Sequence, residues 1–410
     1  MTRLLKLFYY CLLLLFSEEV SAQAFGFQID NDANKATIRF ETYNNLIVVP
    51  VVLNNAIPLR FIVDTGVNTA ILTDKLFSDI LSIEYGKKIS LLGADGKREV
   101  NAYVARNVSL RLPGVTGKSQ SVLVLEEDYL NLGSTIGTEI HGIIGYELFR
   151  RFVVELNYNT KTMVLKEPHA FNPKKKYTEV DISLEDTKPY ITSDVTLQNG
   201  ETIAAKFMFD TGASHAILLN MGADERIDLP ETHLPRLLGK GLGGDIDGCL
   251  GRVEKVKLKH FEIENPIISF ANEESYHNLF KSTSRQGSIG GGLISRFNVV
   301  IDYFRGKLYL KKNRKFNDPF DYNMSGIEIT AEGKKYNEYI VHSVADNSPG
   351  YEAGVKKGDR IISINSYPAT NYSLGAMNTL LMKKENKNIK LVIKREEEQI
   401  KTTFRLEKIL

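Results

Sequence analysis

The chain has 410 residues, of which 43% are hydrophobic and 25% charged, and its formal net charge is +2 at pH 7. This composition is that of an ordinary globular protein, and it excludes a largely disordered chain, a strongly basic nucleic-acid-binding surface and an acidic tail. The length predicts two or three domains, each large enough to bury a hydrophobic core.

Residues 1–22 have the features of a secretory signal peptide. Arg3 and Lys6 accompany an apolar stretch from Leu4 to Phe16, and the small residues of a cleavage site end at Ala22. The apolar stretch is shorter than the roughly 20 residues that a membrane span needs, which favours cleavage over an uncleaved anchor. We therefore expect export, to the periplasm or out of the cell, with no membrane span after signal cleavage.

Cleavage would also remove one of the two cysteines. Cys11 lies within the signal peptide, which leaves Cys249 as the only thiol of the mature chain. No internal disulfide can then form, so stability has to come from packing. Because no histidine stands near Cys249 in the sequence, we expect a core or flap residue rather than a nucleophile.

The remaining sequence repeats itself. The tripeptide Asp-Thr-Gly occurs at 64–66 and again at 210–212, each time after an apolar run, 61–63 and 207–209. Residues 141–145 match 287–290 at nearly the same offset, and residues 151–158 match 296–303. Three matches in the same order are not explained by chance, so they predict a duplicated chain.

Both halves have the pattern of β structure. Runs rich in β-branched residues, such as Ile47 to Leu53, are separated by turn residues such as Pro113-Gly114. Short helices are expected only after each Asp turn, over Ala70 to Leu81 and Ala216 to Gly222. We predict two all-β lobes, at 23–170 and 171–318, joined by an exposed segment near Pro168 to Lys176.

The two repeated aspartates predict a shared site. A single carboxylate at the end of a buried strand is costly, because burial removes its hydration. If the two lobes bring Asp64 and Asp210 together, one carboxyl group can hold a proton while the other stays charged. Such a pair can act as acid and base at once.

These paired turns, each followed by an apolar-Gly element, resemble those of aspartic peptidases over residues 24–315. The resemblance implies a two-lobed fold of double-psi-type β-barrels and catalysis by Asp64 and Asp210 on water, with no cofactor and no metal. It also implies that a monomer suffices and that four residues support the pair: Thr65, Gly66, Thr211 and Gly212.

The residues after each glycine indicate a subtype. Pepsin-like enzymes have a hydroxyl there, whereas this chain has Val67 and Ala213 and resembles the retropepsin-like group. Without those hydrogen bonds to the charged form the pair should be less acidic, so we expect activity nearer neutral pH. The first lobe departs further, because Val67-Asn68-Thr69 stands where the second has Ala213-Ser214.

Catalysis also needs a cover over the substrate. Two glycine-rich hairpin turns lie at the right distance from the aspartates to serve as flaps, although both could be ordinary β-turns. The flap candidates are Gly93, Ala94, Asp95 and Gly96 in the first lobe and Gly241, Leu242, Gly243 and Gly244 in the second.

Residues 319–410 have a different character and predict a small α+β domain. Ser348-Pro349 opens a short helix that ends at Gly354, and a turn then leads into an alternating strand ending at Asn365. This string resembles a PDZ domain, which binds a peptide as an additional strand. The resemblance implies that Ser325, Gly326 and Ile327 form the peptide-binding loop. Met324 replaces the first glycine of the family's Gly-Leu-Gly-Phe pattern, so a peptide C-terminus, an internal segment and a neighbouring lobe are all open as ligands.

Sequence motifs for nucleotide binding and metal binding are weaker. Residues 239–244 match a dinucleotide-binding fingerprint but lack a surrounding βαβ unit, and no histidines stand at metal-ligand spacing. The leading hypothesis is an exported aspartic endopeptidase that cuts peptide or protein substrates, with the PDZ domain binding substrate or a partner. The alternatives are a non-catalytic peptide-binding protein on the same duplicated fold and a structural adaptor whose active surface is the PDZ domain.

Overall fold

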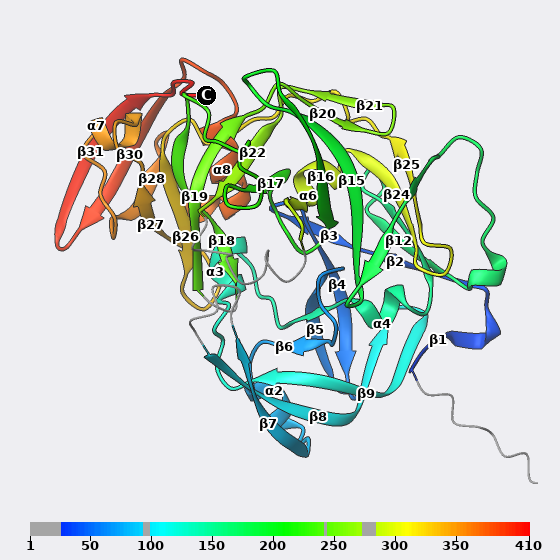
Figure 1. Cartoon of the computed structure of the whole chain (residues 1–410). Coiled ribbons are helices and arrows are strands. Elements are labelled where there is room, and N and C mark those ends of the chain that lie inside the picture. The colour runs from blue at the N-terminus through cyan, green and yellow to red at the C-terminus, as the bar shows by residue number, and fades with distance from the viewer. Residues whose placement is uncertain (1–25, 93–98, 242–243, 273–283) are drawn as a thin grey trace, which may run out of the picture.

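The structure is a computed structural model that describes residues 26–92, 99–241, 244–272 and 284–410. The predicted signal peptide lies outside these residues. The described chain is mainly β and forms two lobes followed by a small C-terminal domain (Figure 1), which confirms the predicted fold class. Within the described ranges, no helix is both long and apolar enough to cross a membrane.

The first lobe is built on a mixed sheet with the strand order β1-β9-β6-β10-β5-β4-β8-β7, and β3 pairs with β4. Its strands are rich in β-branched and apolar residues, and the central strand β4 is buried along most of its length. The elements are β1 (Gly26–Ile29), β2 (Lys35–Arg39), β3 (Glu41–Tyr43), β4 (Leu46–Leu53), β5 (Ile57–Val63), β6 (Ile71–Leu72), α2 (Leu76–Ile80), β7 (Tyr85–Leu92), β8 (Glu99–Leu112), β9 (Val115–Leu125), α3 (Leu132–Ile136), β10 (Gly142–Ile144), α4 (Tyr146–Phe149), β11 (Val153–Asn157) and β12 (Thr162–Lys166).

The second lobe repeats this plan with the order β18-β19-β22-β17-β23-β16-β15-β20-β21, and β14 pairs with β15. In both lobes the strand that leads to the Asp turn has a parallel neighbour, β10 beside β5 and β23 beside β16. The elements are β13 (Thr178–Asp181), β14 (Ser183–Glu185), β15 (Lys188–Thr196), β16 (Thr202–Phe209), β17 (Ile217–Asn220), β18 (Leu234–Gly241), β19 (Gly244–Arg252), β20 (Lys255–Leu258), β21 (Phe261–Glu264), β22 (Ile267–Ala271), β23 (Gly287–Ile289), α6 (Gly291–Ile294), β24 (Phe297–Asp302) and β25 (Lys307–Lys312).

A third sheet joins the lobes, with the order β13-β25-β24-β11-β12-β2. At its centre the two repeated segments pair with each other, because β11 and β24 are antiparallel and Leu156 lies opposite Val299. The largest hydrophobic cluster is continuous across the two lobes and contains buried side chains from both. The duplication seen in the sequence therefore builds one body with a shared core.

Two expected helices differ from the structure. The segment from Ala216 to Gly222 was expected to be helical, but residues 217–220 form strand β17, which pairs with β22 and β23. Its three consecutive apolar residues are buried on both faces of the sheet, and such a run does not distinguish a buried strand from a helix. In the first lobe a helix was expected over Ala70 to Leu81. The structure has strand β6 at Ile71–Leu72, and only Leu76–Ile80 is helical.

The C-terminal domain has the strand order β26-β27-β28-β30-β31, so β26 is an edge strand. Ser348 caps α7 by accepting a hydrogen bond from the Tyr351 N–H, and Gly354 follows the helix with φ 74°. The elements are β26 (Ile327–Glu332), β27 (Glu338–Val344), α7 (Pro349–Glu352), β28 (Arg360–Ile364), β29 (Tyr367–Pro368), α8 (Leu374–Met382), β30 (Asn388–Arg395) and β31 (Glu398–Arg405).

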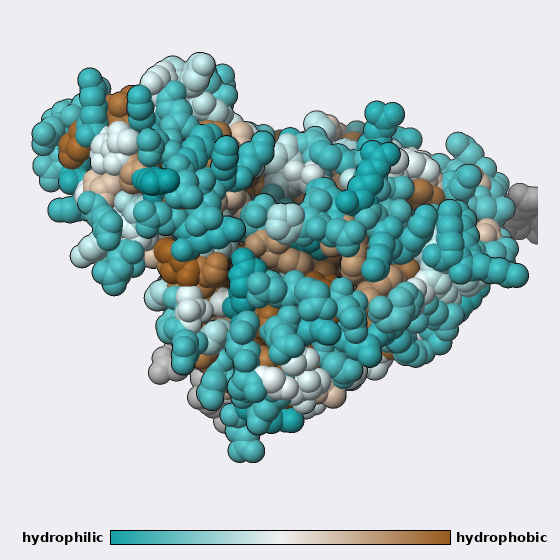
Figure 2. All heavy atoms as spheres, turned by 90° about the horizontal axis from the view of Figure 1, so that it is seen from above, coloured by the Kyte–Doolittle hydropathy of each residue, from teal (hydrophilic) through white to brown (hydrophobic). Residues whose placement is uncertain are grey.

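This domain packs on the second lobe. Leu234, Leu250 and Ile267 of that lobe share a hydrophobic cluster with the core of the C-terminal domain. Seen from above, apolar side chains gather in a band between more hydrophilic surfaces, across the middle of the molecule and beside the C-terminal domain (Figure 2).

Candidate active site

The two Asp turns stand at equivalent places in the two lobes. Asp64 follows β5 and its N–H donates to the carbonyl of Ile144, 2.9 Å away, on the parallel neighbour β10. Asp210 follows β16, and its N–H donates to Ile289 in the same way at 2.8 Å. The parallel strand pairs thus hold both turns by the same backbone contact.

Two buried threonines interlock the turns across the boundary between the lobes. Thr65 Oγ1 donates to the carbonyl of Phe209 at 2.6 Å, and Thr211 Oγ1 donates to that of Val63 at 2.9 Å. Each hydroxyl also accepts the backbone N–H of the other threonine at 3.1 Å. The donors and acceptors of these four buried hydrogen bonds are all satisfied, so the hydrogen bonds fix the two turns relative to each other.

The hydrogen bonds between the two turns place the carboxyl groups of Asp64 and Asp210 in contact. Asp64 and Asp210 share a side-chain hydrogen bond, and each accepts the N–H of its own turn glycine, Gly66 at 2.6 Å and Gly212 at 2.9 Å. A methyl group on Gly212 would lie only 2.2 Å from Asp64 Cγ. Glycine is therefore required there, because any side chain would displace the carboxyl group from the opposite lobe.

The apolar-Gly elements at 141–145 and 287–290 pack against the backbone of the two Asp turns. A methyl group on Gly145 would lie 1.9 Å from the backbone oxygen of Asp64, and one on Gly290 would lie 2.4 Å from that of His215. The repeated glycine is thus explained by close packing of backbone against the Asp turns.

The surroundings of the pair favour one shared proton. Burial raises the pKa of Asp64, the negative charge of Asp210 raises it further, and the Gly66 N–H opposes both effects. Burial also raises the pKa of Asp210, but nearby Arg285, the Gly212 N–H and the hydrogen bond from Asp64 lower it. Because the pKa of both carboxyl groups is raised, the pair is expected to retain one proton between them.

Asp210 lines a cavity of about 280 Å³ between the lobes. Its walls come from α3 in the first lobe and from the Asp turn, β18 and β19 in the second. The lining includes Leu46, Leu132, Thr135, Ile136, Asp210, Gly212, Ala213, His215, Leu238, Gly239, Gly241, Ile246, Arg285 and Ser288. A larger hollow of about 660 Å³ lies between the second lobe and the C-terminal domain, and it contains neither aspartate.

Two polar residues of this cavity were not predicted from the sequence. His215 accepts or donates a hydrogen bond with Ser288 Oγ at 2.9 Å, and burial, reinforced by Arg285, lowers its pKa to about 4. Arg285 is only 5% exposed and its Nη1 lies 2.9 Å from the sulfur of Met208. The position of His215, five residues after Asp210, was the one available sequence signal.

Comparison with known families agrees with this geometry. The profile described as aspartyl protease matches the chain twice, at 49–148 and 193–293, and that described as PDZ domain matches 340–395. The chain is a duplicated member of the aspartyl protease family with a C-terminal PDZ domain. No curated protein sequence matches it.

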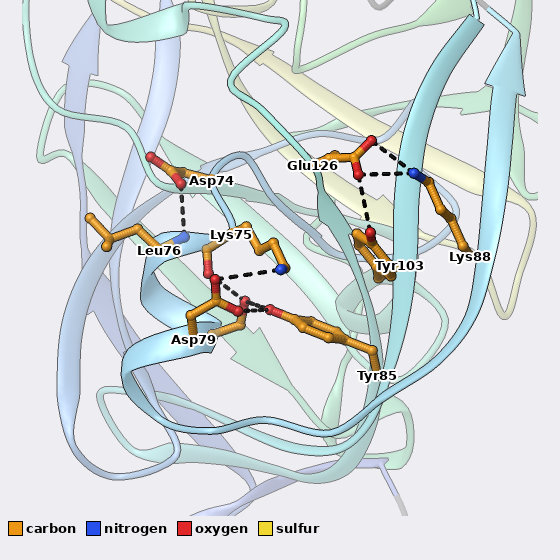
Figure 3. A network of polar contacts seen from close by, with 9 residues as sticks. Asp74, Lys75, Leu76, Asp79, Tyr85, Lys88, Tyr103 and Glu126 are labelled. Atoms are coloured by element: carbon orange, nitrogen blue, oxygen red, sulfur yellow. Dashed lines mark hydrogen bonds and ion pairs between the residues drawn. The ribbon is translucent and has the colours of Figure 1, made fainter.

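In the first protease lobe the flap candidates Gly93, Ala94, Asp95 and Gly96 lie outside the described residues. The arms beside them, β7 and β8, pair up to Leu92 and Glu99. A polar network holds the base of these arms (Figure 3): Tyr85 donates to Asp79 at 2.6 Å, and Glu126 accepts from Lys88 at 2.9 Å and from Tyr103 at 3.1 Å. The hairpin is thus anchored to the lobe at its base.

In the second protease lobe, β18 and β19 form the corresponding hairpin, and Gly241 lies opposite Gly244. Leu242 and Gly243, at its tip, lie outside the described residues. Gly241 and Ile246 line the same cavity as Asp210, so this hairpin borders the aspartate of its own lobe. Cys249 lies on β19, where burial raises the pKa of its thiol.

Among the described residues, no group of three His, Cys, Asp or Glu side chains is arranged to hold a metal ion.

The loop of the PDZ domain is held mainly by its own contacts. Ser325 is fully buried, its N–H donates to Asn323 Oδ1 at 2.9 Å, and its hydroxyl accepts the N–H of Ile327 at 3.1 Å. Gly326 has φ 73°, in the left-handed region that glycine favours. The N–H groups of Ser325 and Ile327 are therefore already engaged, whereas among the described strands none pairs with the outer edge of β26.

Proposed function

We propose that this protein is an exported aspartic endopeptidase, which hydrolyses peptide bonds with a water molecule activated between Asp64 and Asp210. The observation that carries this proposal is the pair itself: two carboxyl groups from opposite lobes share a hydrogen bond, and one of them, that of Asp210, lines a cavity between the lobes. An alternative role as a non-catalytic peptide-binding protein gives no reason for so costly a buried pair of acids.

The chemistry follows from the unequal charges of the two carboxyl groups. A water between them loses a proton to the charged carboxylate as its oxygen attacks the carbonyl carbon of the scissile bond. The proton on the other carboxyl group stabilises the developing negative charge on the carbonyl oxygen. Collapse of the tetrahedral intermediate breaks the C–N bond, and a proton moves to the leaving amine. Neither an acyl-enzyme nor a metal ion takes part.

The substrate we propose is an extended polypeptide. The cavity walls are largely apolar, from residues such as Leu46, Ile136 and Leu238, and the β18–β19 hairpin borders them. Among the described strands none pairs with the outer edge of β26, which supports peptide binding by the PDZ domain as an added strand. By this binding the domain would recognise substrate or a partner. Both aspartates lie on one chain, so we propose that a monomer is active, and residues 1–22 are the basis for proposing export.

The proposal is tested with a proteome-derived peptide library, in which cleavage products are identified by mass spectrometry near neutral pH. The mature chain should cut a defined set of peptides, and Asp64→Asn and Asp210→Asn should each cut none. A wild-type chain that cuts nothing would favour the non-catalytic alternative. Cleavage that persists in either variant would exclude the two-aspartate mechanism.

A further inference from the structure

The edge strand of the PDZ domain lies between two walls of the candidate cleft. On one side β26 lies against α3, which contributes Leu132, Thr135 and Ile136 to the cavity. On the other side Glu328 of β26 pairs with Arg236 of β18, the strand that contributes Leu238 and Gly239. One strand of the C-terminal domain therefore touches elements from both lobes.

The contact with α3 leaves no free space. Gly133 of α3 lies so close to Tyr336, in the turn between β26 and β27, that a methyl group at 133 would meet the ring at 2.3 Å. Just after α3, a methyl group at Gly137 would lie 2.6 Å from Cβ of Leu374, the first residue of α8. Residues 133–137 of the first lobe therefore contact the C-terminal domain at two places, the β26–β27 turn and the start of α8.

The conformation of Tyr336 also indicates a specific contact. Its φ of 50° lies in the left-handed region, which is unfavourable for a bulky side chain. Surrounding contacts must maintain such a conformation, and the ring packed on Gly133 is one of them.

The contact with β18 combines charge and apolar packing. Arg236 Nε lies 2.8 Å from Glu328 Oε1, and its Nη2 donates to Oε2 at 3.2 Å, so the guanidinium binds both carboxylate oxygens. Leu234, at the start of β18, is buried in the hydrophobic cluster of the PDZ domain. These contacts hold the base of the second hairpin.

We propose that the PDZ domain positions both walls of the substrate cleft, with Tyr336 and Glu328 as positioning residues, and that α3 is the intramolecular occupant of its β26–α8 face. Its effect on cleavage rests on the proposed peptidase function. A peptide that adds to β26 beside α8 would meet α3 and would have to move it. Peptide capture by the PDZ domain and substrate binding in the cleft are therefore coupled, each changing the affinity for the other.

The expected signature is a change in KM rather than in kcat. α3 and β18 line the cavity, but neither makes a hydrogen bond to Asp64 or Asp210 within the described residues. Displacing them weakens substrate binding and leaves the pair of carboxyl groups intact.

The first test separates the steric contact from a general effect of substitution. With the library peptide that wild type cuts fastest, Gly133→Ala should raise KM about tenfold or more and change kcat by less than about threefold. Tyr336→Gly in the otherwise wild-type chain removes the ring and suits the left-handed backbone, and it should also raise KM because α3 loses the group that positions it. Gly375→Ala is the matched control, because a methyl group there meets no atom within 4 Å.

The second test uses the ion pair and remains informative if Gly133→Ala fails to fold. Glu328→Arg should raise KM, and the double exchange Glu328→Arg with Arg236→Glu should recover most of the loss. Wild-type KM in both Gly133→Ala and Glu328→Arg would overturn the proposal, as would a fall in kcat with KM unchanged.

Hydrogen exchange of the full chain provides a readout that does not depend on peptidase activity. Gly133→Ala and Glu328→Arg should each raise amide exchange in 132–136 and 234–241 and leave the β11–β24 sheet as protected as in wild type. Unchanged exchange in both segments would overturn the positioning role. If wild type cleaves no peptide, the proposed function fails and the exchange data still decide this inference.

Discussion

Thr65 and Thr211 each accept the backbone N–H of the other at 3.1 Å, although 146 residues separate them in the sequence. Both side chains are 99% buried, since only 1% of each is exposed. The two hydroxyls donate across the same boundary to Phe209 and Val63. This reciprocal contact connects the two halves directly beneath the aspartates.

Thr65→Val should destabilise the chain while keeping nearly the same side-chain volume. The Thr211 N–H and the Phe209 carbonyl would each lose a partner, and an unsatisfied buried polar group costs about 1–3 kcal/mol. We expect a loss of at least about 2 kcal/mol, measured by denaturant unfolding. Thr65→Ser retains the hydroxyl and should lose less than half of that. Equal stability of the two variants would show that the hydroxyl is not what matters.

The two turn glycines should differ in their sensitivity to alanine. A methyl group at Gly212 lies 2.2 Å from Asp64 Cγ, whereas one at Gly66 has its nearest contact at 3.0 Å, with Asp64 Oδ1. Gly212→Ala must therefore move the Asp64 carboxyl group, and a displacement of that size costs about a hundredfold in rate. Gly66→Ala should cost clearly less in kcat on the same peptide. The reverse order would contradict the geometry of the pair.

The activity should depend on pH in a way that reflects the raised pKa values. The basic limb marks loss of the shared proton, and burial together with the Asp210 charge raises the pKa of Asp64 above the ordinary range. The acidic limb marks protonation of the remaining carboxylate, and burial also raises the pKa of Asp210. The maximum of kcat/KM should therefore lie nearer neutral pH than in stomach enzymes. A maximum well below about pH 4, the ordinary range for aspartate, would refute this.

The same pair should make stability depend on pH. Above the ordinary aspartate pKa of 3.8 the unfolded chain has lost this proton, whereas the folded chain keeps it, so the free energy of unfolding falls as pH rises toward the raised pKa. The slope from one proton is at most about 1.4 kcal/mol per pH unit. His215 acts in the opposite sense, because its pKa is lowered to about 4 and its contribution to stability grows as pH rises toward 6.5.

Comparison with Asp64→Asn isolates the contribution of the pair from that of His215. The difference in unfolding free energy between variant and wild type should grow in favour of the variant between about pH 5 and pH 7. Parallel pH profiles for the two chains would mean that the pair holds no extra proton in the folded state.

The sequence predicted the parts of the fold that the duplication repeats. The matched segments 151–158 and 296–303 repeat at nearly the same offset in the sequence as the two Asp turns. In the structure they pair with each other as β11 and β24. The predicted contact between Asp64 and Asp210 follows from the same symmetry. A repeat relates segments that are far apart in the sequence, whereas the residue pattern of one strand does not indicate which other strand lies beside it.

Features that depend on a single tertiary contact were not predictable. The short apolar run of β17 is a strand because β22 and β23 lie beside it. α3 has five residues, too few for an isolated helix to be stable, and it packs against the PDZ domain. Arg285 enters the cavity from a segment with no motif of its own. Neither periodicity nor composition records such contacts.

We propose that Asp64 and Asp210 of one chain form one hydrolytic site. The most direct measurement is the cleavage rate of the best library peptide by wild type, Asp64→Asn, Asp210→Asn and an equimolar mixture of the two variants, over a wide range of dilution. Wild type should keep its specific activity on dilution, and the variants and their mixture should show none. Activity in either single variant, or activity restored by mixing, would contradict a site built within one chain.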